Sequence, residues 1–378
     1  MKKNVYITGS NCITPLGFDV ASNWEAVQNN VSGIKSHHNV GQLESFYASV
    51  VDNNALESAF SKIESGNGFT KLEKMMILAL QPLVKENKIT KKTAFIFSTT
   101  KGNISLLEDE KETAESAQLA VLAKKISTYF GFETEPIVVS NACVSGILAV
   151  SVAKRMIQSG LYDDAFVVAG DEVSEFVLSG FNSFQAMSAE PCKPYDANRT
   201  GVTLGEAVAA VYITADETLV KPNSFRIMGD GAVNDANHIS GPSRTGEGLF
   251  RSIESAFKEA NLDRKKLNFI SAHGTATLYN DEMEAIAFNR QGLHEVPVNS
   301  LKGYYGHTLG ASGLLETVLA MESAKQNRLI VSKGYSDLGV SQAINLITEN
   351  QAVEMDYFLK TASGFGGCNT AVLFEKVK

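Results

Sequence analysis

The sequence contains only four cysteines in 378 residues, and none of them forms a Cys-x-x-Cys pair. They are Cys12, Cys143, Cys192 and Cys368, and their wide spacing argues against a disulfide framework or a zinc site and favours a reducing compartment. Basic residues are also in the minority, because 34 Lys and Arg face 42 Asp and Glu for a net charge of -8. This balance argues against nucleic acid as a partner, although one local basic patch would suffice to bind an acidic carrier protein.

Long apolar runs are absent too. No run approaches the roughly 20 residues that a membrane-spanning helix needs. The apolar stretch in the basic start MKKNVYITGSN breaks after four residues, too early for a secretory signal. We therefore expect a soluble, cytoplasmic protein, and its 44% hydrophobic content is enough for a large core.

Strand-like and helix-like segments alternate along the whole chain. Runs of β-branched and aromatic residues predict strands at 4–8, 94–98, 137–140, 165–169, 207–214, 224–230, 268–272, 297–299, 357–362 and 370–376. Amphipathic stretches predict helices at 21–29, 70–86, 114–129, 145–159, 248–260, 281–290 and 311–326. This alternation predicts an α/β fold with largely parallel sheets covered by helices.

A polar, proline-containing stretch, ADETLVKPN at 215–223, divides the chain near its middle. We expect two similar α/β halves, residues 1–220 and 221–378. The more charged region 43–125 is interpreted as an excursion over the sheet, either a lid or an interface.

Cys143 lies in SNACVSGILAVSVAKRM, between a predicted buried strand and an apolar helix. A thiol at a helix N-terminus meets unpaired N–H groups and the positive end of the helix dipole, which favour the nucleophilic thiolate. Cysteine is also a common packing residue, so position alone leaves both readings open.

His273 follows a predicted strand in ISAHGTATLYNDE and would point into the crevice at the sheet edge. Lys302 and His307 lie in VNSLKGYYGHTLGASGLLE, where the following helix contains Glu316. A buried Lys302 would need a partner such as Glu316. Taken singly, a structural histidine and a surface lysine explain these residues equally well.

Glycines surround Phe365 in TASGFGGCNTAVLF, in a turn between two strands. The turn is either an ordinary hairpin with an exposed Phe, or a loop whose N–H groups bind an oxyanion beside a moving aromatic gate.

Together and in this order, these segments resemble the β-ketoacyl-[acyl-carrier-protein] synthases, the elongating condensing enzymes with a thiolase-type fold. The resemblance runs from VYITGSNCITPLG to GFGGCN and includes YDANRTGVTLGE. It implies a five-layered αβαβα sandwich of two duplicated halves. It further implies that Cys143 accepts the acyl group, that His273 and His307 are the histidines of HGTxT and GHxxGA, and that Lys302 pairs with Glu316.

By the same resemblance, the N–H groups of Cys143 and Phe365 form the oxyanion hole, with Phe365 as the gate. Substrate-binding residues would be Thr275, Thr277, Gly366 and Asn369. The implied reaction condenses the acyl-cysteine with malonyl-[acyl-carrier-protein] and releases CO2 and a 3-oxoacyl chain. No metal or permanently bound cofactor is expected, because phosphopantetheine of the acyl carrier protein carries both substrates.

Departures from the family pattern affect substrate and assembly. The chain is short before Cys143, Ser363 replaces a common Phe, and Cys368 replaces a Thr. Fatty-acid elongation and polyene or polyketide synthesis therefore both stay open. We expect a homodimer or a heterodimer with a related subunit, and the alternative function is a non-catalytic, chain-length-factor-like partner subunit. His238 is a further candidate for the pocket entrance.

Overall fold

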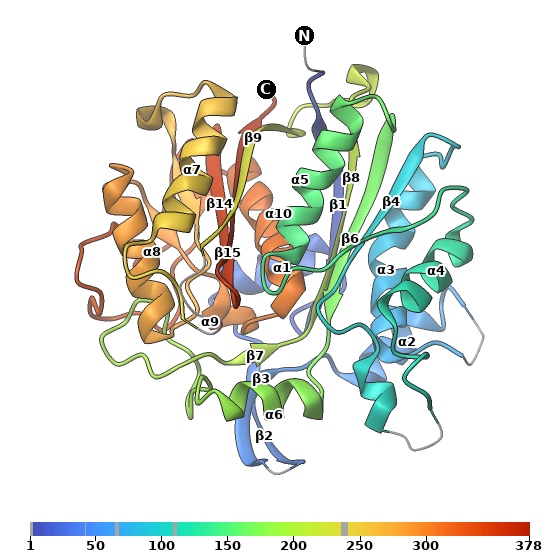
Figure 1. Cartoon of the computed structure of the whole chain (residues 1–378), viewed down its shortest axis with the longest axis horizontal. Coiled ribbons are helices and arrows are strands. Elements are labelled where there is room, and N and C mark those ends of the chain that lie inside the picture. The colour runs from blue at the N-terminus through green and yellow to red at the C-terminus, as the bar shows by residue number, and fades with distance from the viewer. Residues whose placement is uncertain (1–2, 42, 65–67, 109–111, 236–240) are drawn as a thin grey trace.

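The computed structural model describes residues 3–41, 43–64, 68–108, 112–235 and 241–378. Its first half contains the elements β1 (Tyr6–Ile13), α1 (Val20–Gln28), β2 (Ile34–Val40), β3 (Leu43–Ser49), α2 (Asn53–Phe60), α3 (Lys71–Glu86), β4 (Thr93–Ser98), α4 (Leu119–Phe130), β5 (Ile137–Val139), α5 (Ser145–Gln158), β6 (Asp164–Asp171), α6 (Glu175–Ser183), β7 (Leu204–Gly205) and β8 (Ala207–Thr214). The second half contains β9 (Phe225–Asn234), α7 (Glu247–Ala260), β10 (Phe269–Ser271), α8 (Leu278–Arg290), β11 (Val298–Asn299), α9 (Lys302–Tyr305), α10 (Ser312–Lys325), β12 (Arg328–Leu329), β13 (Gln351–Ala352), β14 (Tyr357–Gly364) and β15 (Cys368–Lys376). Figure 1 shows both halves.

The large sheet repeats one strand order. Its ten strands run β11-β10-β14-β15-β9-β1-β8-β6-β4-β5. One half runs from β9 at the centre to β11 at the edge, and the other from β1 at the centre to β5 at the edge. Each edge strand is short and parallel to its neighbour. The halves meet where β1 pairs with β9 over Tyr6↔Arg226 and Ile7↔Phe225. The division of the chain at residue 220 falls between β8 and β9 and stays a prediction.

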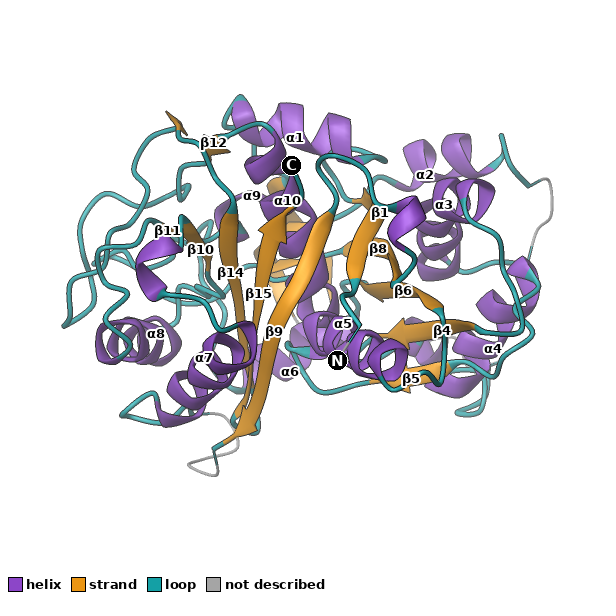
Figure 2. Cartoon of the chain, turned by 90° about the horizontal axis from the view of Figure 1, so that it is seen from above, coloured by secondary structure: helices purple, strands orange, loops and turns teal. Residues whose placement is uncertain are grey.

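Helices form three layers around the two half-sheets. α5 and α10 pack against each other in the centre, α3 and α4 cover the outer face of one half, and α7 and α8 cover the other (Figures 1 and 2). Separate apolar clusters fill the central and the two outer layers. The expected thiolase-like, five-layered α/β architecture is confirmed.

The residues of α10 explain why this helix lies in the central layer. Twelve of its residues are buried, on all its faces, which is the pattern of a helix covered by protein on every side. α3, an outer helix, has instead one apolar face and a capping box, in which Thr70 and Glu73 satisfy each other's N–H groups. Outer and inner helices are therefore distinguished by their apolar pattern.

The predictions for region 43–125 were partly wrong. The strand β4 and helix α3 in this region belong to the core of the first half. Within this region β3 and α2 were not predicted, and outside it β2 and β7, which complete a small sheet with β3, and helix α6 were not predicted either. No described helix has both the length and the apolar character required to cross a membrane.

Candidate active site

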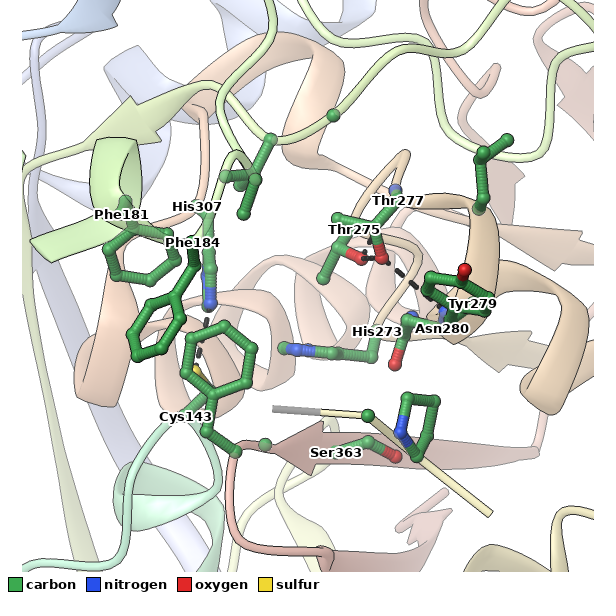
Figure 3. Close-up of a pocket in the computed structure, with 18 of the residues that line it drawn as sticks. Cys143, Phe181, Phe184, His273, Thr275, Thr277, Tyr279, Asn280, His307 and Ser363 are labelled. Carbon is green, nitrogen blue, oxygen red and sulfur yellow. Dashed lines mark hydrogen bonds between the residues drawn. The ribbon is translucent and has the colours of Figure 1, made fainter. Parts of the chain in front are cut away.

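A cavity of 270 Å³ lies where the two halves of the fold meet, and segments far apart in the sequence line it. Cys143 lies just before α5, His273 just after β10 and His307 in the segment before α10 (Figure 3). Phe365 comes from the β14–β15 turn. One donor atom each of Cys143, His273 and His307 lies within 4.8 Å of the others. The structure therefore brings the three predicted reactive residues together.

Cys143 lies two residues before α5 and follows Ala142, whose φ of 44° is in the left-handed region. This local turn precedes the helix and leaves Cys143 buried, with 7% of the residue exposed, in the lining of the cavity. The Sγ atom lies 3.0 Å from Nε2 of His307, the contact drawn as a dashed line in Figure 3. The thiol thus has a proton acceptor within direct reach.

The pKa of the Cys143 thiol is raised to about 12, chiefly by burial and next by Cys368, while Lys302 acts in the opposite direction. Burial of Cys143 therefore opposes the thiolate that its position before a helix N-terminus favours. Desolvation of the charged form outweighs the favourable helix terminus, so the thiol stays protonated until a base removes its proton.

His307 is held by neighbours on both sides. Its backbone N–H donates to the carbonyl of Thr203, 2.6 Å away, and its carbonyl accepts from the N–H of Gly205 in β7. Its Nδ1 lies 3.0 Å from the hydroxyl of Ser312, which directs Nε2 towards Cys143. Burial, followed by the charge of Lys302, lowers the pKa of His307 well below its usual range, so the imidazole is neutral.

His273 is oriented by Lys302. The Lys302 ammonium lies 2.7 Å from Glu316, 2.6 Å from the carbonyl of His273 and 3.2 Å from its Nδ1. An ammonium group has no acceptor, so Nδ1 accepts and Nε2 carries the proton. Burial first and Lys302 second lower the pKa of His273 well below its usual range. Neutral His273 and His307 rings lie 5.2 Å apart, nearly perpendicular.

Lys302 and Glu316 lie behind the cavity, away from its lining. Lys302 is fully buried and Glu316 nearly so, and their ion pair was expected from sequence. A second fully buried lysine, Lys360 of β14, lies 2.5 Å from the other oxygen of Glu316 and was not predicted. One lysine in the otherwise apolar and small run of this strand is the signal that could have found it.

The β14–β15 turn brings the predicted gate, Phe365, to the cavity that Cys143 also lines. A Cβ on Gly364 would lie 2.9 Å from Sγ of Cys368 and 3.0 Å from the backbone nitrogen of Cys143, so a larger residue would push the turn away from Cys143. Phe365 is 37% exposed and packs against Phe181 and Phe184, with ring centroids 5.6 and 5.5 Å away. Phe181 lies in the unpredicted helix α6 and Phe184 directly follows it, and both rings stand beside Cys143 in Figure 3.

The other predicted binding residues also line the cavity, namely Thr275, Thr277, Gly366 and Asn369. The hydroxyls of Thr275 and Thr277 lie 2.9 Å apart, and Asn369 accepts a hydrogen bond from Ser363. Their roles in binding stay predictions. His238 lies outside the described residues.

Residues 2–218 match the family model "Beta-ketoacyl synthase, N-terminal domain", and residues 225–332 match "Beta-ketoacyl synthase, C-terminal domain". The chain is 27% identical to 3-oxoacyl-[acyl-carrier-protein] synthase 2 of Vibrio harveyi, over 100% of this chain and 99% of that protein. A ketosynthase from Xenorhabdus doucetiae, solved in complex with its chain length factor, has a similar fold (TM-score 0.87, 24% identity, 99% and 98% coverage). So does a type II polyketide ketosynthase solved with its acyl-carrier protein (TM-score 0.84, 19% identity, 100% coverage of both chains).

Proposed function

Because the chain belongs to the β-ketoacyl synthase family of condensing enzymes, we propose that Cys143 accepts an acyl chain and that the two histidines then drive decarboxylative condensation with a malonyl thioester. The enzyme is a ketosynthase of fatty-acid or polyketide synthesis. The observation that supports these roles is the convergence of Cys143, His273 and His307 in one cavity, with their reactive atoms within 4.8 Å.

In the first step, Cys143 attacks the thioester carbonyl of an acyl chain carried on phosphopantetheine. His307 takes the thiol proton through Nε2, and the same proton then protonates the departing pantetheine sulfur. The backbone N–H groups of Cys143 and Phe365 bind the oxyanion, and losing one such donor typically costs about 100- to 1000-fold in rate. The products are an acyl-cysteine and a free carrier thiol.

In the second step, a malonyl thioester occupies the emptied cavity. The C–C bond to its carboxylate breaks, CO2 leaves, and the electron pair forms an enolate. Its oxygen accepts hydrogen bonds from Nε2–H of both His273 and His307. The carbanion attacks the acyl-cysteine carbonyl, the C–S bond to Cys143 breaks, and the departing thiolate takes one proton from solvent water.

The hydroxyl of Ser312 allows His307 to serve both steps. A hydroxyl both donates and accepts, so Ser312 can accept from Nδ1–H when Nε2 must receive the thiol proton. It can donate to Nδ1 when Nε2 must carry a proton towards the enolate. Ser312 is fully buried, and its hydroxyl also lies 3.1 Å from that of Thr308.

A cysteine and two histidines can also bind zinc. Here the ammonium of Lys302 contacts His273 directly and opposes a second positive charge at this point. We therefore assign these side chains to acyl transfer.

An acyl carrier protein is the proposed partner, in a dimer of two copies of this chain or of this chain with a related subunit, acting in the cytoplasm. The complexes of similarly folded ketosynthases with an acyl-carrier protein and with a chain length factor support this proposal. The alternative of a non-catalytic partner subunit would leave the cysteine and both histidines without a purpose.

The test is the intact mass of the protein after exposure to a panel of acyl-carrier thioesters. We expect a gain of one acyl group in the wild type and none in Cys143→Ala. Cys12→Ala, which replaces a fully buried cysteine of the core, is the matched control and should gain the same mass as the wild type. A folded protein that gains no acyl group from any thioester would support the partner-subunit function instead.

A further inference from the structure

Lys360 is a buried cation that the proposed mechanism does not use. It projects from β14, is fully buried, and lies 2.5 Å from Oε2 of Glu316. Its Nζ also lies 3.1 Å from the carbonyls of both Ser271 and Ala272, the two residues before His273. Lys360 therefore contacts both the partner of Lys302 and the backbone that leads into His273.

The two lysines share Glu316 in a way that satisfies every donor. An ammonium group has three donors. Those of Lys302 meet Glu316 Oε1, the His273 carbonyl and His273 Nδ1, and those of Lys360 meet Glu316 Oε2 and two carbonyls. Without Lys360, Oε2 would lack this partner and could compete with His273 Nδ1 for a donor of Lys302.

Charged and titratable groups from several elements surround His273. Those that face it or its backbone are Lys302 (α9), His307 (before α10), Cys143 (before α5), Glu316 (α10), Lys360 (β14) and Glu284 (α8). Glu284 accepts the backbone N–H groups of His273 and Gly274, so its negative charge lies on the backbone side of the residue. On the imidazole side, two lysines share one carboxylate and leave one net positive charge, which disfavours protonation of the ring.

We infer that Lys360 is a positioning residue of the condensation step: by binding Glu316 and the two carbonyls before His273, it holds Lys302 on Nδ1 and keeps His273 in its neutral, Nε2–H form. This inference rests on the proposed function. It makes decarboxylation depend on Lys360 while acylation of Cys143, which His307 assists, does not. Burial, Lys302, His307 and Lys360 together lower the pKa of His273, in keeping with this role.

The experiment compares Lys360→Met, Lys360→Arg and the wild type with octanoyl-pantetheine and malonyl-pantetheine as probes. Cys143 acylation is followed by intact mass, and CO2 release and 3-oxo product are followed from pH 5 to 9. For Lys360→Met we expect acylation close to that of the wild type and condensation about tenfold slower or more. The acid limb, which is the fall in condensation rate at low pH as His273 becomes protonated, should lie about one pH unit higher, because loss of the neighbouring cation makes this protonation easier. Lys360→Arg keeps the charge and should keep the wild-type acid limb.

Lys154→Met is the matched control. Lys154 is also fully buried and also bridges two carboxylates, Asp230 and Glu259, each 2.6 Å away, but lies on α5 against β9 and α7. It should lower the melting temperature without moving the acid limb. If Lys360→Met lowers the melting temperature to the same extent and leaves both the acid limb and the ratio of condensation to acylation unchanged, the inference is wrong.

Glu316→Gln keeps the inference testable even if Lys360→Met fails to fold. Removing the shared negative charge should move the acid limb to lower pH, and a limb that stays in place or moves up would overturn the inference. A wild type that is neither acylated nor active would instead refute the proposed function, so the two failures are distinguishable.

Discussion

Replacing His307 by Gln should change the pH dependence of Cys143 acylation as well as its rate. In the wild type, burial raises the pKa of the thiol to about 12 and lowers that of His307, so both groups are neutral over the range between these values. A neutral thiol beside a neutral base reacts with direct proton transfer to Nε2, 3.0 Å away. The wild-type acylation rate should therefore be nearly flat between pH 7 and 9.

Glutamine has a similar volume but accepts no proton on its amide nitrogen. The variant would depend on spontaneous thiolate, which at pH 8 is about one molecule in ten thousand for a thiol with a pKa of about 12. General-base catalysis contributes about 10²- to 10⁴-fold, so acylation at pH 8 should fall by that factor. The remaining rate should rise about tenfold per pH unit, because the thiolate fraction does so below its pKa.

The assay is single-turnover acylation by octanoyl-pantetheine, followed by intact mass from pH 6 to 10. His294→Gln is the control, since His294 is about half exposed at the surface and should behave as the wild type. A wild-type rate that rises tenfold per pH unit, or a flat profile in His307→Gln, would refute the reasoning that a buried thiol is activated by this histidine.

Three further variants test the surroundings of the thiol. Gly364→Ala should slow acylation about 100-fold, because its Cβ would lie 3.0 Å from the nitrogen of Cys143 and displace an oxyanion donor. The same single-turnover acylation assay measures this rate, and a rate equal to that of the wild type would contradict the prediction. Ser312→Ala should slow acylation up to about tenfold by removing the hydroxyl that orients His307, the usual cost of one hydrogen bond; an unchanged rate constant would show that the hydroxyl has no such role. Phe365→Ala should shorten the half-life of the acyl-enzyme, because water gains access to the thioester; intact mass over time measures it, and an equal half-life would argue against a gate.

Controls for these variants are available elsewhere in the chain. Gly68→Ala adds a Cβ that meets no atom within 4 Å, so it should leave acylation unchanged. Phe250→Ala removes a phenylalanine from α7, on the outer layer, and should leave the half-life of the acyl-enzyme unchanged.

Most strands of the large sheet, and most helices that pack on it, could be predicted from sequence because these elements have strong local patterns. The predicted helix 70–86 is observed at Lys71–Glu86, and 145–159 at Ser145–Gln158. Helix α6 was missed although Ser174 caps its N-terminus and Val177, Leu178 and Phe181 lie on one face. β2 and β3 form a hairpin and were missed because β2 is mostly polar and β3 lacks a run of β-branched residues, and the two-residue β7 was missed because its partner β3 is distant in sequence.

The residue types and their order along the chain already point to a thiol, two histidines, a buried ion pair and a glycine-rich turn, because each occurs in a recognisable local motif. The tertiary structure decides what these groups do chemically. It brings Lys360 to Glu316 from a distant strand, and it removes water from Cys143 so that burial outweighs the helix terminus. Protonation depends on the sum of desolvation and charges from all surrounding segments, and no local stretch of sequence contains that sum.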